Sequence, residues 1–555
     1  MKKRTLVTAL ALLLMAICAA SRPCAALLAA DGNVSVTSTP LQRPTLCTGR
    51  FAPHELDHLT TTADGVVRMY QANGAGLAVN FLDNDGDPDL VLGSELGPNT
   101  LLWNEGAASG ELRWRKTELG VGPTRALTVL DVDNDGWRDI VLTRHTGALN
   151  YWHNQGDGSF VQEVLAGVAA PAYSLAWGDF DLDGDLDLAT ASYDAAILSE
   201  VGNNFLLSGG GGVTVYTNRA GRFVPMRLAG EAQGLGLAAA DFNEDGRPDL
   251  WVGNDFHLRD QLWLNQGAAG NSPVWTPSQP FPETSNGTMG GDWADIANNG
   301  QLALFTTDMN PYDISVANLA AWLPVMAVLE ETNAPGDPQR SANMLEMRQP
   351  DGSWRNEAAR SGVEATGWSW AGQFGDLDND GWLDLYVVNG MIEERLFHHL
   401  PNHELVEENQ AFRNLGGGRF TRMPAWGLNA TLSGRSMALA DLDLDGDLDV
   451  VVNNLRGPAM LYENQLCGQS IELDLQWSGS QNRDAIGAQV TVYTGAGTLR
   501  RDVRAASGYL TGVAPRLHFG LPAASTVDRL EVRWPDGERA TVQPVEVNSL
   551  LRIVR

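Results

Sequence analysis

The sequence predicts an all-β protein: a seven-bladed β-propeller with calcium loops, followed by a small C-terminal β domain. Three observations support this. A short acidic loop occurs seven times, apolar runs of strand-forming residues flank each copy, and the copies recur about every 50 to 80 residues. That spacing leaves room for a four-stranded sheet per repeat, and a closed ring of sheets protects their edges. An open solenoid of nonapeptide repeats is disfavoured because its period is a single turn.

The N-terminus has the pattern of an export signal. Basic residues at positions 2–4 precede an apolar run at 6–20, which is too short to span a bilayer. We assign residues 1–30 to this signal, with cleavage open among Ala20, Ala26 and Ala30. Residues 31–59 are interpreted as a linker. The mature chain is therefore expected to be periplasmic, at the cell surface or extracellular, without a transmembrane anchor.

The third copy of the loop shows the chemistry most clearly. Carboxylates stand at its first, third, fifth and ninth positions, and Gly184 stands at the sixth. Calcium takes roughly six to eight oxygen ligands at about 2.3–2.6 Å, and the glycine permits the sharp turn that brings alternate side chains inward. Three further loops are equally complete. The predicted ligands of these four loops are Asp131, Asp133, Asp135 and Asp139; Asp179, Asp181, Asp183 and Asp187; Asp376, Asp378, Asp380 and Asp384; and Asp441, Asp443, Asp445 and Asp449.

The other three loops depart from the pattern. The first has Phe81 at the first position, and the fifth has Ala297 and Ala303 at the third and ninth, so we expect weak metal binding or none in the fifth and an incomplete site in the first. The fourth has an amide, Asn243, which still offers an oxygen. The ligands predicted in the first and fourth loops are Asp83, Asp85 and Asp89, and Asp241, Asn243, Asp245 and Asp249.

The repeat region is expected to cover residues 60–466. Cys47 and Cys467 flank it, so they pair if the ring brings its ends together in an oxidising compartment; two free thiols are the alternative, and the sequence leaves both open. Insertions at 310–338 and 391–408 are the best candidates for a binding face. The first contains a short apolar helix broken by Pro324. The second carries three histidines, interpreted as part of a solvated loop rather than a metal site: His398, His399 and His403.

Residues 467–555 lack the acidic loop and alternate like half-buried strands, which predicts a separate β domain. The formal net charge of −30 makes nucleic acid an unlikely partner, because phosphate binding needs a basic face. The acidity is instead explained first by a demand for metal ions.

These motifs resemble known families. The loops look like FG-GAP and VCBS repeats, and the stretches 482–490, 507–510, 516–520 and 532–537 resemble the ASPIC and UnbV domain. Together they resemble bacterial relatives of the cartilage acidic protein family. The resemblance implies a secreted calcium-binding propeller with a C-terminal β module, and it supplies no established reaction.

Two functions remain open. The favoured one is an exported recognition or adhesion module that binds an extracellular protein or glycan at one propeller face or in the central channel, with calcium as a structural cofactor. The alternative is a secreted hydrolase or lyase acting on polysaccharide. A catalytic role is conceivable for Ser507 and His518, and stacking on sugar for Trp368 and Trp370. Packing explains these residues better, so no catalytic residue is assigned.

Overall fold

The computed structural model describes residues 26–27, 30–31, 33–44, 46–62, 65–202, 211–269, 272–330 and 336–555. Strands take up 46% of the protein and helices 6%, which confirms the all-β class. The helices are α2 (Asp194–Val201), α3 (Val316–Glu330) and α4 (Ala358–Ser361), with short 3-10 turns at Ala107–Ser109, Pro401–His403 and Pro424–Trp426. Most of the predicted export signal lies outside the described residues.

Seven four-stranded antiparallel arrays occur in the described ranges, and each has one predicted loop between its first two strands. The first three are β5 (Leu77–Asn80), β6 (Asp89–Leu92), β7 (Pro98–Asn104) and β8 (Trp114–Val121); β9 (Leu127–Leu130), β10 (Asp139–Leu142), β11 (Asn150–Asn154) and β12 (Phe160–Glu163); and β13 (Ser174–Gly178), β14 (Asp187–Ala191), β15 (Val213–Arg219) and β16 (Arg222–Ala229). The fourth is β17 (Gly234–Ala240), β18 (Asp249–Asn254), β19 (Gln261–Ala269) and β20 (Ser272–Ser278).

The last three arrays include the longer connections. They are β22 (Gly291–Ala294), β23 (Ala303–Thr306), β26 (Met344–Arg348) and β27 (Trp354–Asn356); β28 (Gly367–Gly375), β29 (Asp384–Asn389), β32 (Gln410–Asn414) and β33 (Phe420–Arg422); and β34 (Gly434–Ala440), β35 (Asp449–Asn454), β36 (Pro458–Asn464) and β4 (Phe51–Leu59). Short strands β21 (Thr284–Ser285), β24 (Met309–Asn310), β25 (Gln339–Arg340), β30 (Met391–Ile392) and β31 (Glu404–Leu405) lie in the connections.

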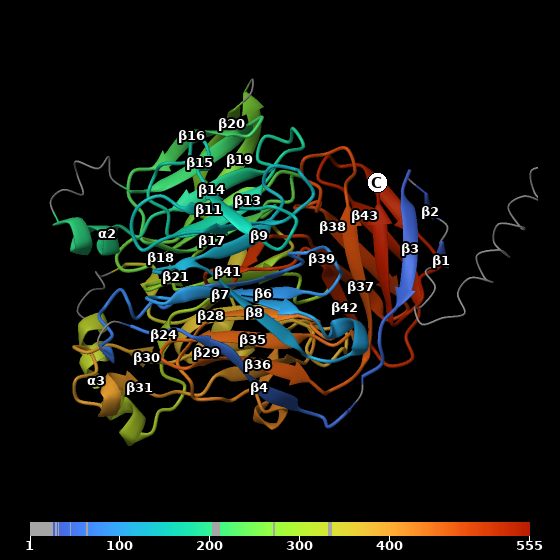
Figure 1. The fold of residues 1–555 in the computed structure, drawn as a ribbon. Helices are drawn as coiled ribbons and strands as arrows, with labels where there is room; N and C mark the ends of the chain where they lie inside the picture. Colours follow the sequence, from blue (N-terminus) through green and yellow to red (C-terminus); the bar gives the residue numbers. More distant parts are fainter. Residues whose placement is uncertain are drawn as a thin grey trace, which may run out of the picture.

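Apolar side chains fill the spaces between neighbouring arrays. Leu77 and Leu90 of the first pack with Ala438 and Val451 of the seventh, so the last array lies against the first. The seventh array is completed by β4, which comes from the N-terminus and pairs with β36. The repeats therefore follow one another around a ring, and the start of the chain takes part in closing it; in Figure 1 the blue β4 lies beside the orange β36.

The segment 31–59 is not the linker that the sequence suggested. Besides β4, it contains β3 (Ser35–Pro40), which pairs with β45 (Ser549–Val554) near the C-terminus. In β4 the inward side chains of Phe51, Leu56 and His58 are buried while their neighbours are mostly exposed. This alternation is the signature of a half-buried strand, and the interpretation as a linker missed it.

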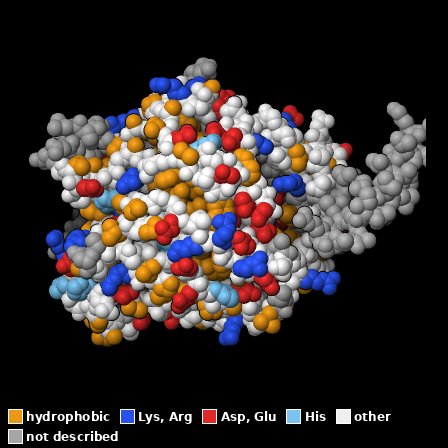
Figure 2. Space-filling model, in the orientation of Figure 1, with side chains coloured by type: hydrophobic (Ala, Val, Ile, Leu, Met, Phe, Trp, Pro, Cys, Tyr) orange, Lys and Arg blue, Asp and Glu red, His pale blue; other side chains and the backbone are white. Residues whose placement is uncertain are grey.

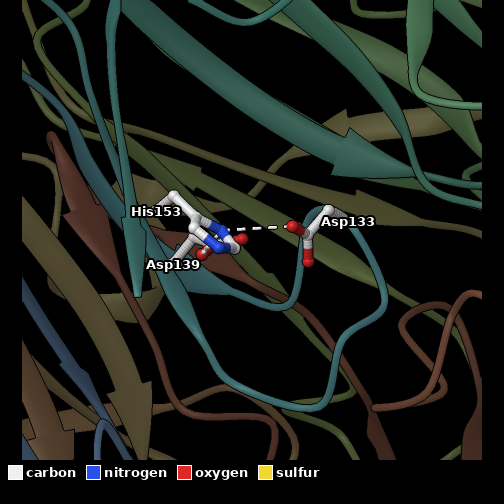
Figure 3. A group of neighbouring side chains, drawn as sticks. All are labelled: Asp133, Asp139 and His153. Carbon is white, nitrogen blue, oxygen red and sulfur yellow. Dashed lines mark ion pairs between the residues drawn. The ribbon is translucent and has the colours of Figure 1, made fainter. Parts of the chain in front are cut away.

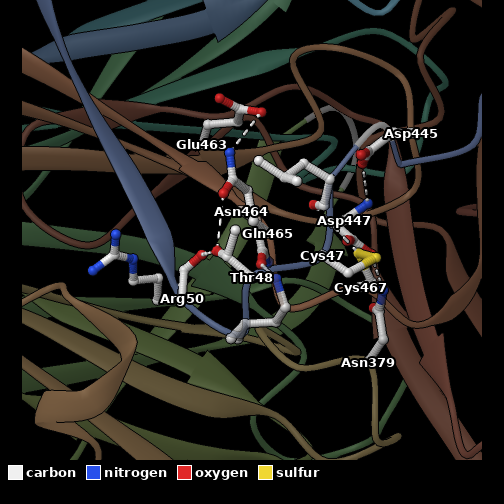
Figure 4. Close-up of a disulfide and its surroundings, with 12 residues drawn as sticks. Cys47, Thr48, Arg50, Asn379, Asp445, Asp447, Glu463, Asn464, Gln465 and Cys467 are labelled. Carbon is white, nitrogen blue, oxygen red and sulfur yellow. Dashed lines mark hydrogen bonds between the residues drawn. A yellow bond between two sulfur atoms is a disulfide. The ribbon is translucent and has the colours of Figure 1, made fainter.

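A disulfide joins Cys47 to Cys467, with the two Cα atoms 5.7 Å apart. It settles the question that the sequence left open. Close by, the Thr48 hydroxyl donates to Gln465 at 2.9 Å. Figure 4 places the bond beside Asp445 and Asp447 of the seventh acidic loop. The link ties β4 to the point where the propeller ends and the C-terminal domain begins.

The C-terminal domain consists of two five-stranded sheets. One has the order β1 (Ala26–Leu27), β3, β45, β37 (Gln469–Gln476) and β42 (Leu517–Leu521); the other has β2 (Ala30–Asp31), β44 (Arg539–Val542), β43 (Val527–Arg533), β38 (Gln489–Thr494) and β39 (Gly497–Asp502). Because β1, β2 and β3 come from the N-terminus, the domain is built from both ends of the chain. In Figure 1 the blue β3 lies among the red C-terminal strands.

This domain is not separate from the propeller, contrary to the expectation. A hairpin of β40 (Ala506–Ser507) and β41 (Thr511–Gly512) leaves it, and β41 pairs in parallel with β5, the first strand of the first array. Contacts of β41 with β9 and β34, and of β40 with β13 and β22, place the hairpin among the first strands of five arrays. At its tip Tyr509 is fully buried. The chain's own hairpin thus occupies the centre of the ring, where the sequence allowed a ligand to bind.

Candidate metal centre

Each acidic loop connects the first strand of an array to the second. In the third loop Gly184 has a φ of +93° and Leu182 a φ of +60°, so the backbone turns sharply within a few residues. The Asp179 carboxylate accepts hydrogen bonds from the backbone N–H groups of Asp183 and Gly184, both at 3.0 Å. The first carboxylate therefore fixes the turn from inside.

The ninth carboxylate has a second structural task. Asp187 accepts hydrogen bonds from the backbone N–H of Phe180 at 2.8 Å and of Asn218 at 2.7 Å, so it joins the start of the loop to the third strand. The same pair of bonds recurs in the first, second, fourth, sixth and seventh loops, at Asp89, Asp139, Asp249, Asp384 and Asp449. This role was not foreseen from loop spacing alone.

Four loops bring their carboxylates together. Ligand atoms within 4.8 Å of one another come from Asp131, Asp133 and Asp135; from Asp133, Asp139 and His153; from Asp179, Asp181 and Asp187; from Asp376, Asp378 and Asp384; and from Asp441, Asp443 and Asp449. These are the four loops with a full set of carboxylates. Asp183, Asp380 and Asp445 stand outside the groups, although each belongs to its loop. Within the residues described, the first, fourth and fifth loops form no such group.

Burial makes these carboxylates costly to ionise. It raises the pKa of Asp187 to about 9 and that of Asp376 to about 8, and neighbouring carboxylates add to the effect. Side-chain cations of the protein partly compensate: Arg219 lies 2.8 Å from Asp181, and Arg413 lies 2.6 Å from Asp378. Several acidic side chains gather where the propeller meets the C-terminal domain (Figure 2).

The donor set fits a divalent cation. One carboxylate oxygen each of Asp131, Asp181 and Asp378 is buried without a hydrogen-bond partner. Such oxygens are costly when unsatisfied, and a hard cation is the partner that several convergent carboxylates accept together. The complete loops would hold the ion through their carboxylates.

In two incomplete loops arginine stands near the missing ligands. The guanidinium groups of Arg516 and Arg138 lie over the Phe81 ring, at 4.4 and 5.5 Å from its centroid. In the fifth loop Arg500 donates to the Gly300 carbonyl at 2.6 Å. Positive charge from the protein is thus placed where the loop sequence no longer supports an ion.

The fourth loop differs again. Its Asn243 amide donates to Asp245 at 2.9 Å, and Arg247 contacts the same carboxylate. The amide oxygen that was expected to coordinate belongs to a side chain already engaged within the loop.

The asparagine that ends the third strand links neighbouring arrays. The Asn154 amide donates to the Leu82 carbonyl of the preceding loop at 2.9 Å, and Asn104 donates to the Leu442 carbonyl of the seventh at 2.8 Å. Asn265, Asn414 and Asn464 make the corresponding bond. The recurrence of these asparagines was visible in the sequence, but their partners lie on another repeat.

The C-terminal domain lies on the loop side of the propeller. Ser480 donates to the Gly184 carbonyl at 2.5 Å, and Arg483 comes within 3.7 Å of Asp131. His518 contacts the Gly446 carbonyl of the seventh loop at 3.0 Å. The predicted metal sites are therefore close to the interface between the two parts of the protein.

The residues weighed for catalysis have structural partners. Trp368 and Trp370 are buried, and Ser507 donates to Asp292 at 2.7 Å within the interface. Ser507 and His518 are engaged by different residues. In the second insertion His399 contacts the Ala321 carbonyl of α3 at 3.1 Å, and among the described residues none of its three histidines belongs to a possible metal group.

Family models match two parts of the chain. The ASPIC and UnbV model matches residues 478–555, and the FG-GAP-like repeat model matches residues 82–142, 131–190 and 404–452. The repeat matches contain the first, second, third and seventh loops. The C-terminal match contains the hairpin that enters the ring.

Relatives cover most of the protein at low identity. Cartilage acidic protein 1 of Mus musculus is 22% identical over 517 residues, spanning 79% of this chain and 74% of the relative, and that of Xenopus tropicalis is 24% identical over 501 residues, spanning 69% and 73%. Among solved structures, BBS1N in complex with ARL6DN (TM-score 0.41, 9% identity, 76% of this chain and 97% of that chain) and the WD40 domain of Toxoplasma gondii coronin (0.39, 9%, 77% and 89%) match at lower similarity. The chain combines FG-GAP-like repeats with a C-terminal ASPIC and UnbV domain and is similar, over most of its length, to cartilage acidic protein 1.

Proposed function

We propose that this protein is an exported calcium-binding propeller that acts as an extracellular or cell-surface recognition or adhesion module. The observation that carries the proposal is the gathering of three carboxylates in each complete loop, together with a buried ligand oxygen that lacks a partner in three of these four loops. Oxygen donors in a tight loop are the chemistry of calcium. Each bound ion would offset the burial, and the repulsion between neighbouring carboxylates, that together raise the pKa values of the loop carboxylates.

Calcium would act here as a structural cofactor. The ninth carboxylate already connects the first strand to the third, and the loops contact the C-terminal domain through residues such as Ser480. An ion in the loop would hold these contacts in place from one side. Removing it would leave several carboxylates crowded in a partly buried turn, where they must either repel one another or take up protons.

Recognition would use the side of the ring away from the C-terminal domain. In Figure 1, α2, α3, β30 and β31 lie on that side. The insertions pack together through Trp322, Trp368 and Phe397, whose ring centroids are 5.6–5.7 Å apart. On the first insertion Val316 is 86% exposed and Leu323 65% exposed. Neighbouring exposed apolar side chains on a packed insertion favour binding of an extracellular protein or glycan.

Export is supported by the disulfide between Cys47 and Cys467, because such bonds persist in oxidising compartments. In the described part of the chain, no helix is long and apolar enough to cross a membrane. The proposed location is therefore the periplasm, the cell surface or the extracellular space.

Calorimetric titration with calcium tests the metal part of the proposal. Asp181→Ala, in a complete loop, is expected to remove one binding event, whereas Asp295→Asn, in the fifth loop, is expected to remove none. Equal losses in both variants would contradict the assignment. Circular dichroism of both variants controls for folding.

Arrays of glycans and matrix proteins test the recognition part. Binding is expected in calcium and is expected to fall when Leu323 is replaced by serine. Blank arrays, together with release of reducing sugars or unsaturated products from polysaccharides, would favour the enzyme instead.

A further inference from the structure

The second acidic loop has a nitrogen donor that the other loops lack. His153, on β11, lies with its Nδ1 atom 3.1 Å from Asp133 and 3.3 Å from Asp139, and with its Nε2 atom 3.9 Å from Asp135. Figure 3 shows the imidazole and the two carboxylates facing one another. Ligand atoms of Asp133, Asp139 and His153 all lie within 4.8 Å of each other.

In the sixth array, too, the position that corresponds to His153 faces the loop. It precedes the asparagine that ends the third strand, and in the sixth array the same position holds Arg413, which lies 2.6 Å from Asp378. In the five other arrays with this asparagine the preceding residues are Trp103, Thr217, Leu264, Arg413 and Glu463. Only the second loop therefore gains an imidazole from this position.

The group also has unused donor capacity. Asp131, which is grouped with Asp133 and Asp135 rather than with His153, is 8% exposed, and its Oδ1 atom has no hydrogen-bond partner. The Tyr151 hydroxyl lies 3.3 Å from His153 Nδ1 but donates its single proton to Asp139 at 3.0 Å, since a carboxylate is the stronger acceptor. A neutral imidazole keeps one lone pair, on the ring nitrogen without a proton, and this lone pair and the Asp131 Oδ1 atom are left for another partner.

Imidazole changes which ion suits the loop. Calcium prefers oxygen ligands alone, whereas zinc, iron, copper and nickel favour imidazole, and manganese tolerates a largely carboxylate set. Metal bonds of about 2.0–2.2 Å place ligand atoms about 2.8–3.6 Å apart at right-angled or tetrahedral geometry. The separations of 3.1 and 3.3 Å fall in this range.

We propose that the second loop binds a divalent transition-metal ion, such as Zn²⁺ or Mn²⁺, through Asp133, Asp139 and His153, with Asp131 as a further oxygen donor. This departs from the function proposed above at one loop only. The third, sixth and seventh loops contain no imidazole in their groups and keep their preference for calcium. The two proposals therefore stand or fall separately.

Spin-echo spectroscopy of the full chain tests the nitrogen ligand directly. The protein is stripped with a chelator, saturated with calcium and given one equivalent of Mn²⁺. Echo modulation from a directly bound ¹⁴N nucleus is expected in the wild type. Its absence, with Mn²⁺ bound, would overturn the proposal without any variant having to fold.

Calorimetric titration with Zn²⁺ in excess calcium gives an independent readout. The wild type is expected to bind one Zn²⁺ tightly. His153→Thr introduces the residue that the third array has at this position, and it is expected to weaken Zn²⁺ binding by more than about 100-fold. Changing a residue that only supports a ligand typically costs about 10–100-fold in metal affinity. His257→Gln is the matched control, because His257 is exposed on the propeller and distant in sequence from every loop carboxylate group. Equal Zn²⁺ affinity in the wild type and His153→Thr would refute the assignment. If the wild type binds Zn²⁺ as expected but shows no calcium binding, only the proposed function is refuted.

Discussion

Replacing Tyr509 by alanine is the most direct perturbation of the hairpin in the ring. The side chain is fully buried, its ring centroid lies 5.4 Å from that of Trp370, and its hydroxyl donates to the Asn73 carbonyl at 3.0 Å. Truncating a buried aromatic residue to alanine costs about 3–5 kcal/mol, and losing the hydrogen bond adds about 1 kcal/mol. We expect Tyr509→Ala to lower the free energy of unfolding by about 4–6 kcal/mol.

Two companion variants separate the contributions. Tyr509→Phe keeps the ring and removes only the hydroxyl, so it is expected to cost about 1–2 kcal/mol, including the carbonyl left without its donor. Tyr493→Ala, on β38 of the same domain, removes a tyrosine whose hydroxyl donates to Glu531 at a partly exposed site. Its cost is expected to be about 1–2 kcal/mol, because the variant loses this hydrogen bond and the contact of the Arg529 guanidinium with the ring.

Urea denaturation in calcium, followed by tryptophan fluorescence, provides the assay. The wild type is expected to unfold in one transition because the hairpin couples the domain to the propeller. Tyr509→Ala is expected to split this into two transitions, since the C-terminal domain loses its central anchor. If Tyr509→Ala costs no more than Tyr493→Ala and the transition stays single, the hairpin does not hold the two parts together.

Three further predictions concern the disulfide, the metal and pH. Reduction of the disulfide that closes 420 residues is expected to lower the melting temperature, with an upper cost of about 6 kcal/mol from chain entropy, and an unchanged melting curve in dithiothreitol would contradict this. Without calcium, burial holds the pKa of Asp187 at about 9, above its ordinary 3.8, so the folded state binds protons more tightly. Stability in chelator should then fall as the pH rises from 5 to 9, and melting curves across this range that rise instead would refute it. Burial lowers the pKa of His58 from 6.5 to about 4. As the pH falls, the unfolded chain is therefore protonated at His58 before the folded protein is, and the free energy of unfolding decreases between pH 6.5 and pH 4. This decrease amounts to about 3 kcal/mol. With calcium present, the free energy of unfolding of His58→Gln is expected to change less over this pH interval than that of the wild type.

The periodic part of the fold was predictable from the sequence because its signals are local. The spacing of Asp179, Asp181 and Asp187 around Gly184 identifies the loop, and the loop in turn marks the junction of two strands. The structure brings together the carboxylates of the same four loops that are complete in the sequence. Whether they bind calcium stays a prediction.

The remaining features depend on contacts between distant residues. The sequence predicts only strand packing for the stretch containing Tyr509, and its place in the centre depends on a ring built from residues some hundreds of positions away. His153 lies well outside the spacing of its loop and reaches Asp133 only because β11 pairs with β10. The strand β4 alternates visibly, but its partner β36 lies at the other end of the repeats.

The pairing of β4 with β36 also determines the stage of synthesis at which the fold can be completed. Phe51 pairs with Asn464, and Ser35 pairs with Val554, so the earliest strands to emerge during synthesis or export must wait for the latest. Until then β4 is an unpaired edge, of the kind that invites association between chains. Because strands near both ends of the chain are paired, an insertion at an exposed turn between outer strands is expected to be tolerated better than a truncation of either terminus.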